Sequence, residues 1–412
     1  MNTQEDLTNP TYGWVMAAVV FILTGLSFGV LGSAGVFMKP LAAEFGWSRG
    51  SLSLGYTAVT LATAASTVIW GILADRHGTR WITMFSAPVL GVSLLLLSRI
   101  DSLWEFYAYH LLFGALGHGA LTGPLYANVS LWFRRNIGLA IGITISGGAV
   151  GQGVVPMIAR LLISEYGWSD TYAILGTGYL IIAIPVALLV RNPPRREGSD
   201  GSETPPMRDG RPFPLPPLVV VSWIALAVIF CCITMSVPIV HLVPLLTDRG
   251  IGPQTAVSAL LVLMMAGALG RILGGRLADQ IGPLQAYISM SLAQTVAVFF
   301  FPIVGGMASI YALAVVFGLF YSGVMASFVV IMRFMVPANY LARSMAVVIM
   351  TGWIGMGIGG WQGGAVFDLT GDYVWSFGIA SIAGFINVGI LMMFYLHIRR
   401  AAARGLAPQL AA

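Results

Sequence analysis

The chain has 412 residues, of which 57% are hydrophobic and only 9% are charged, and its net charge is +5. A soluble domain carries about a quarter charged residues, so this composition excludes an ordinary soluble protein and indicates a membrane protein. The basic residues are spread over short polar segments and form no patch, which argues against a nucleic-acid partner. The two cysteines, Cys231 and Cys232, are adjacent within an apolar run and predict neither a disulfide nor a metal site.

The first residues, MNTQEDLTNPTYGW, are acidic and lack the basic stretch of a cleaved signal peptide, so we expect the first apolar run to stay in the membrane. Apolar runs of the length that crosses a bilayer, about 20 residues, then recur along the chain. They must be helices, because no water inside a bilayer satisfies free backbone groups. The twelve expected spans are 13–38, 51–74, 81–99, 104–131, 137–163, 171–191, 217–247, 254–279, 284–305, 307–333, 341–367 and 373–397.

A polar, proline-rich stretch at residues 192–216 interrupts the apolar runs and predicts a linker loop. It separates a six-helix bundle at residues 1–191 from a second six-helix bundle with a short tail at residues 217–412. A repeat relates the two bundles, because several motifs recur at one offset of 204 residues. The recurring pairs are Gly71 and Gly275, Asp75 and Asp279, Gly78 and Gly282, Gly148 and Gly352, Gly151 and Gly355, Gly153 and Gly357, and Gly167 and Gly371. We therefore expect an all-α membrane protein built from two pseudo-symmetric bundles.

The distribution of basic residues predicts the orientation. With the N-terminus inside, 15 of the 21 Lys and Arg residues fall in inner loops and tails. This excess predicts that both termini and the linker are cytoplasmic. The expected outer loops and outer span ends hold Lys39, Arg49, Arg99, Arg160 and Arg249.

Arg271 is the remaining basic residue, and it lies in the interior of an apolar span that carries no charge from Ala259 to Leu269. An arginine at a helix centre costs roughly 2.5 to 3.5 kcal/mol on insertion scales, so something should compensate for it. A guanidinium grips a carboxylate through two parallel hydrogen bonds, which predicts an anchor for an anionic substrate. Pairing with a backbone carbonyl or a nearby carboxylate, or extension toward an interface, is the alternative. One cation suits one carboxylate and favours a monocarboxylate.

Further polar side chains within the spans are candidates for the same site. His118, Thr122 and Tyr126 are spaced to share one helix face, and Tyr321 lies in the analogous span of the second bundle. His241 lies toward the outer end of the seventh span, where a change of charge near neutral pH would suit proton transfer. The other candidates are Tyr56, Gln152, Trp353 and Gln362. Interhelical hydrogen bonding or core packing is the alternative role for each of them.

These features together resemble the major facilitator superfamily. The family carries a Gly-x-x-x-Asp-Arg-x-Gly motif between spans 2 and 3, which is present here as Gly71, Asp75, Arg76 and Gly78, followed by Arg80. The second copy retains Asp279. The resemblance implies that these residues tie neighbouring helix ends together on the cytoplasmic face and favour the outward-open state.

Within that superfamily the chain resembles the monocarboxylate porters. The resemblance rests on YGW at residues 12–14, on WFRRNIGLAIGITISGGAVG from residue 132, on HLVPLLTDRGI from residue 241, on the span 8 arginine, and on FDLTGDYVWSF from residue 367. It implies that Arg271 binds the substrate carboxylate. The chain departs from the family at Gly267, where some members place a proton-carrying aspartate. The proton carrier is then His241, His118 or the substrate itself.

We therefore expect a secondary transporter that moves a lactate- or pyruvate-like monocarboxylate with a proton by alternating access. Its expected setting is the bacterial inner membrane, as a monomer in the lipid bilayer with no cofactor. A carboxylate exchanger of the oxalate or formate type, or a multidrug exporter, is the alternative. The spans contain no paired acids, metal cluster or nucleophile–base pair, so we do not expect an enzyme.

Overall fold

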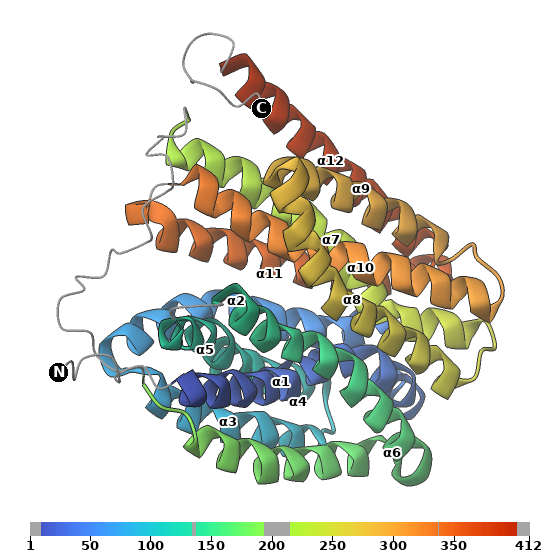
Figure 1. The fold of residues 1–412 in the computed structure, drawn as a ribbon. Helices are drawn as coiled ribbons and strands as arrows, with labels where there is room; N and C mark the ends of the chain where they lie inside the picture. Colours follow the sequence, from blue (N-terminus) through green and yellow to red (C-terminus); the bar gives the residue numbers. More distant parts are fainter. Residues whose placement is uncertain (1–9, 134–136, 193–214, 337, 402–412) are drawn as a thin grey trace.

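The computed structural model describes residues 10–133, 137–192, 215–336 and 338–401. Within them every element is helical (Figure 1). The first bundle consists of α1 (Pro10–Phe45), α2 (Arg49–His77), α3 (Thr79–Leu97), α4 (Leu103–Leu112), η1 (Phe113–His118), α5 (Gly119–Trp132) and α6 (Ile137–Leu188). The second consists of α7 (Pro217–Asp248), α8 (Pro253–Ile281), α9 (Pro283–Phe300), α10 (Met307–Met335), α11 (Ala338–Thr370) and α12 (Val374–Ala401).

The helices account for the twelve expected spans. Within the described residues, nine helices are long and apolar enough to cross a membrane by length and composition. The segment labelled α6 consists of two helices that meet at a sharp turn at Gly167 (φ 78°, ψ 176°), and each of them is one of the expected spans. The fourth expected span is divided among α4, the single π-turn η1 and α5, and the ninth is the shorter α9. The expected all-α membrane fold is confirmed.

The repeat is visible in the backbone of the turns. Glycine tolerates a positive φ at no steric cost, and such glycines end helices here. Gly78 (φ 81°) ends α2, and Gly282 (φ 92°) ends α8. The other pairs at the same offset of 204 residues are Gly46 (φ 67°) with Gly250 (φ 79°) and Gly167 (φ 78°) with Gly371 (φ 77°). The first of these two pairs extends the repeat beyond the positions singled out from the sequence.

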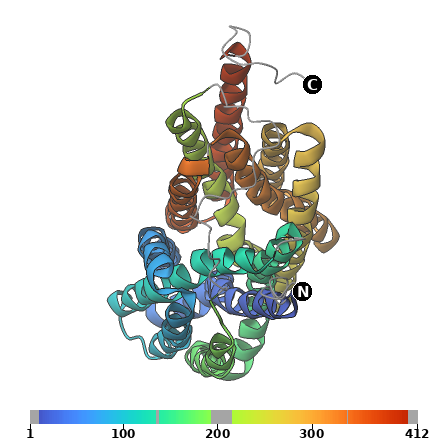
Figure 2. The same ribbon diagram turned by 60° about the vertical axis from the view of Figure 1, so that its left-hand side comes forward.

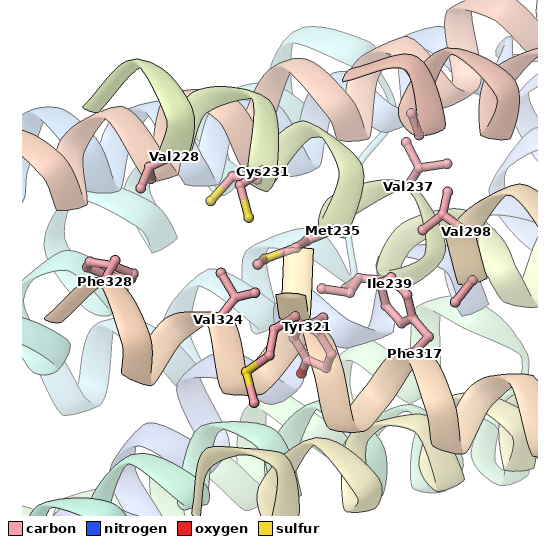
Figure 3. Packing of buried hydrophobic residues seen from close by; sticks show 14 of the residues in the cluster. Val228, Cys231, Met235, Val237, Ile239, Val298, Phe317, Tyr321, Val324 and Phe328 are labelled. Carbon is pink, nitrogen blue, oxygen red and sulfur yellow. The ribbon is translucent and has the colours of Figure 1, made fainter. Parts of the chain in front are cut away.

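Each bundle has its own hydrophobic core. Figure 1 shows α1–α6 in blue to green below α7–α12 in yellow to red, and the two groups stay distinct in Figure 2. One buried cluster runs from Met16 to Val190 and takes a single residue, Val240, from the other bundle. The second runs from Val220 to Ile398 and takes only Val36 from the first. Figure 3 shows the apolar packing of α7 and α10 within this second cluster.

Glycines bring the helix backbones close together, in a pseudo-symmetric way. Gly151 of α6 lies against the carbonyl of Gly25 in α1, and Gly355 of α11 lies against the carbonyl of Ile229 in α7. Both members of this contact are shifted by the same 204 residues. Small residues at such crossings allow the close backbone approach that holds helices together in a bilayer.

The same symmetry governs the interface between the bundles. Gly153 of α6 packs on Leu261 and Met264 of α8, and Gly357 of α11 packs on the equivalent positions 57 and 60 of α2. The bundles therefore meet along two equivalent seams, α6 with α8 and α2 with α11. Any site between the bundles lies between these two seams.

Candidate functional site

Arg271 bridges the two bundles. It lies on α8, ten residues before the end of the helix at Ile281, which is about 15 Å along the axis. Its Nε donates to the Ser322 hydroxyl of α10 at 3.1 Å, and its Nη1 donates to the Ile145 carbonyl of α6. Its Nη2 makes no hydrogen bond to any described residue. The carbonyl pairing considered from the sequence is therefore present, and one face of the guanidinium remains available.

One predicted tyrosine lies near this guanidinium. Tyr321 on α10 precedes Ser322, whose hydroxyl accepts from Arg271, and its ring lies against Gly267, one turn before Arg271 on α8. Tyr126 lies on α5. Tyr126 is partly buried, whereas Tyr321 is 5% exposed and its hydroxyl donates to the Met264 sulfur at 3.2 Å. The hydroxyl of Tyr56 on α2 is buried without a hydrogen-bond partner among the described residues, and its ring lies against Gly360 of α11. Of the three predicted tyrosines, these contacts place Tyr321 next to Arg271.

His118 occupies the π-turn η1 and contacts the opposite bundle. Its Nδ1 is 2.6 Å from the Ser27 hydroxyl, and its Nε2 is fully buried with no hydrogen-bond partner. Its ring lies edge-on to Trp353 of α11 at 5.1 Å and to Phe28 of α1 at 4.6 Å. Single π-turns occur frequently at functional sites. The arrangement leaves one ring nitrogen free at the interface between the bundles.

His241 lies elsewhere, seven residues before the end of α7. It is fully buried, and both ring nitrogens have partners: Nε2 donates to the Gly360 carbonyl at 2.8 Å, and Nδ1 lies 3.3 Å from the Tyr373 hydroxyl. The ring also packs against Gly363. His241 therefore joins α7 to α11 and to the turn before α12.

The two predicted glutamines form no hydrogen bond with Arg271 in the described part of the chain. The main chain of Gln152 packs on Gly32 of α1, and its buried side chain makes no hydrogen bond to a described residue. Gln362 donates to the Ser376 carbonyl of α12 at 3.2 Å. No group of three His, Cys, Asp or Glu residues that could hold a metal ion occurs among the described residues.

The predicted gating motif lies where α2 ends and α3 begins, and we call this end of the molecule the motif end. Gly78 makes the turn, and Asn192 accepts hydrogen bonds from the backbone nitrogens of Thr79 (2.9 Å) and Arg80 (3.2 Å). The side chains of Asp75, Arg76 and Arg80 are exposed and form no ion pair with a described residue. Gly71 lies on α2 with open space around it, and the side chain of Asp279 in α8 lies outside the described ones.

The opposite end holds an ionic cluster that sequence reasoning missed. Asp248, at the end of α7, accepts the guanidinium fork of Arg49 at the start of α2, with Nη2 to Oδ1 at 2.9 Å. It also pairs with the Lys39 ammonium of α1 at 2.6 Å. Both ion pairs join one bundle to the other. We call Lys39, Arg49, Asp248 and Asp368 the latch, and this end the latched end.

Asp368 and two rings complete the latch. The Asp368 carboxylate accepts the backbone nitrogens of Arg49 (3.0 Å) and Gly50 (2.7 Å), so it caps the N-terminus of α2 from the other bundle. The Arg49 guanidinium lies 3.7 Å from the centre of the Phe367 ring, and its Nη1 donates to the Tyr373 hydroxyl at 3.0 Å. Nothing in the sequence pairs these residues, which come from opposite ends of the chain.

Comparison with known proteins shows which families and structures this chain is similar to. Residues 20–314 match the family model described as Major Facilitator Superfamily. The chain is 27% identical to human "Monocarboxylate transporter 11" over 92% of this chain and 83% of that protein. It is 22% identical to "Uncharacterized MFS-type transporter YcxA" of Bacillus subtilis, over 89% of this chain and 91% of that one. A bacterial homolog of the human lysosomal transporter Spinster, solved in an inward-facing and occupied conformation, superimposes with a TM-score of 0.71 at 16% identity and covers 97% of this chain and 99% of that one.

Proposed function

This chain belongs to the major facilitator superfamily of multi-pass membrane transporters, and from that premise we propose that it moves a small monocarboxylate together with a proton by alternating access. The relatives named monocarboxylate transporters support this substrate class. The observation that carries the proposal is the position of Arg271, a cation between the bundles with a free amino group.

In this proposal Arg271 holds the substrate carboxylate. Its Nε and Nη1 are positioned by Ser322 and Ile145, which leaves Nη2 to donate to an incoming anion. A carboxylate that also displaces the Ile145 carbonyl would take both terminal amino groups in the fork geometry that guanidinium favours. The hydroxyls of Tyr126 and Tyr321 supply further donors beside it. A second carboxylate on the substrate would have no cation of its own, which favours a monocarboxylate.

We propose His118 as the proton carrier. An aspartate in place of Gly267 would have to displace the Tyr321 ring, because a Cβ at that position would lie 2.9 Å from it. His118 has a free, buried Nε2 at the contact between the bundles, and imidazole changes its charge near neutral pH. His241 has partners on both nitrogens and lies within the latched end. The substrate carboxylate would neutralise Arg271, and the proton would travel with it on His118, so the loaded site would keep the net charge of the empty one.

The bundles at residues 1–191 and 217–412 are the moving units in this proposal, joined by the linker at residues 192–216. The latch closes one end, and the motif residues at the other end are unpaired among the described residues. We assign the motif end to the cytoplasm of a bacterial cell, because most Lys and Arg residues lie on that side. The conformation described here would then face inward, and pairing of the motif would favour the opposite state.

Uptake of labelled L-lactate into proteoliposomes under an inward proton gradient tests the proposal. The parent should accumulate lactate, and Arg271→Gln should abolish accumulation. Arg271→Lys should retain a small fraction of it, because the ammonium keeps the charge without the fork. The matched control is Arg99→Gln, which replaces an exposed arginine in a loop. A folded parent that accumulates no lactate or pyruvate would remove the proposed substrate.

Exchange of one carboxylate for another is the second candidate, and the absence of an acid at Gly267 favours it. An exchanger would require a counter-substrate inside the vesicle and would ignore the pH gradient. Counterflow without any response to pH would therefore replace the symport proposal.

A further inference from the structure

A cavity lies at the latched end, along the seam of α6 and α8. Its volume is about 310 Å³, and roughly 10–15 Å³ of such volume is enough to hold one water molecule, so it has room for a small organic anion. Its lining comes from four helices and the turn before α8, and consists of Gly35, Val36, Lys39, Pro40, Arg160, Val243, Thr247, Gly250, Ile251, Gly252 and Pro253. The Lys39 side chain that borders it is 38% exposed, so the cavity is accessible to solvent.

The groups around this cavity leave positive charge uncompensated. Arg160 forms no ion pair and no hydrogen bond with a described residue, and its Nε is buried. Among the described residues, Lys39 has one acidic partner, Asp248, and shares it with Arg49. The N-terminus of α8 also faces the cavity, and its N-cap residue Gly252 offers no side-chain acceptor. A helix N-terminus carries a partial positive charge that attracts anions.

The equivalent position in the other seam shows what such a site holds. The offset of 204 residues places the start of α2 at Arg49 onto the start of α8 at Pro253. At α2 the helix N-terminus is capped by the carboxylate of Asp368. The residue equivalent to Asp368 is Ser164, whose hydroxyl donates to its own helix at the Leu161 carbonyl instead. The α6–α8 seam therefore has the helix end and the cations but lacks the carboxylate.

We propose that this cavity is a second binding site, which takes a small carboxylate from solution in the place that Asp368 occupies at the other seam. The carboxylate accepts from Arg160 and lies at the N-terminus of α8, with Lys39 as the second cation. That this carboxylate is the transported acid rests on the proposed function, in which the site receives substrate from the outer side. An anion here also competes with Asp248 for Lys39, so occupancy weakens one ion pair of the latch.

The unfolding temperature of the purified protein tests the site, with L-lactate, acetate and chloride as probes at constant ionic strength. The measurement uses Arg271→Gln protein, so that the central anchor is absent. Both carboxylates should raise the unfolding temperature saturably by roughly 1–3 °C, because a ligand stabilises the state that binds it. Adding Arg160→Gln should abolish the rise, Arg160→Lys should raise the half-saturating concentration several-fold, and Arg99→Gln should change nothing.

Three outcomes would overturn the site: no saturable rise in Arg271→Gln protein, an equal rise after Arg160→Gln, or an equal rise with chloride. Because these readouts measure binding alone, they are independent of lactate uptake. Absent uptake with an intact Arg160-dependent shift would reject the proposed function and keep the site. Intact uptake without the shift would reject the site and keep the proposed function.

Discussion

Replacement of Asp248 by asparagine should open the latched end. The Asp248 carboxylate holds both interbundle ion pairs, and its side chain is 27% exposed while that of Arg49 is 16% exposed. A hydrogen bond to a charged group contributes about 1.5–3 kcal/mol, and an exposed ion pair contributes about 0–1 kcal/mol. For this partly buried cluster we expect a loss of about 2 kcal/mol, which shifts the ratio of open to latched molecules roughly 30-fold.

Distances between two spin labels measure that ratio. Trp104 at the start of α4 is 82% exposed and Ile303 after α9 is 57% exposed, and they mark the latched end of the two bundles. Cysteines at these positions can be labelled after Cys231 and Cys232 are replaced by alanine. In the parent the shorter distance should dominate, and Asp248→Asn should convert a large fraction of molecules to the longer one.

Asp170→Asn is the control, because Asp170 is an exposed acid at the same end without a hydrogen-bond partner among the described residues. It should leave the distribution unchanged. A distribution in Asp248→Asn that matches the parent would refute the reasoning, since the ion pairs would then contribute nothing to closure.

Three further predictions concern the proton, the helix crossings and the motif. His118→Asn should make lactate uptake insensitive to the proton gradient, whereas His241→Asn should retain sensitivity; the opposite pattern in vesicle uptake would exchange their roles. Gly151→Ala should destabilise the protein by about 1–3 kcal/mol, because the methyl group meets a backbone carbonyl, whereas Gly142→Ala has open space and should not. Thermal unfolding measures both variants, and equal unfolding temperatures would contradict the close contact between the helices at Gly151. Asp75→Asn should increase the latched population in the label experiment, and a decrease would contradict the role of the motif.

Several features of the site could be predicted from residues alone. Arg271 is conspicuous because a charge in a long apolar run needs a partner, and the shared face of His118 and Tyr126 follows from helical spacing. The sequence could not show that Trp353 lies against His118, since that contact joins helices from different bundles. It also could not distinguish the two histidines, because partners on the ring nitrogens depend on packing.

The latch could not be predicted from the sequence for the same reason, since it too depends on contacts between the two bundles. Arg49 and Asp248 are 199 residues apart, and both lie at span ends where charges are ordinary. Only the docking of the two bundles brings them together. The same docking shows that the seam of α6 and α8 lacks the carboxylate that caps α2.

The sequence by itself determined the membrane class, the spans and the repeat, because each rests on local composition or on a constant spacing. Hydrophobic length predicts a helix wherever it occurs, and a bilayer leaves no alternative for the backbone. The tertiary structure alone decided which charges are paired and which are free, because this depends on the approach of helices distant in the chain. It also placed the interbundle ion pairs at one end of the molecule, since Asp248 meets Lys39 and Arg49 only where the two bundles dock.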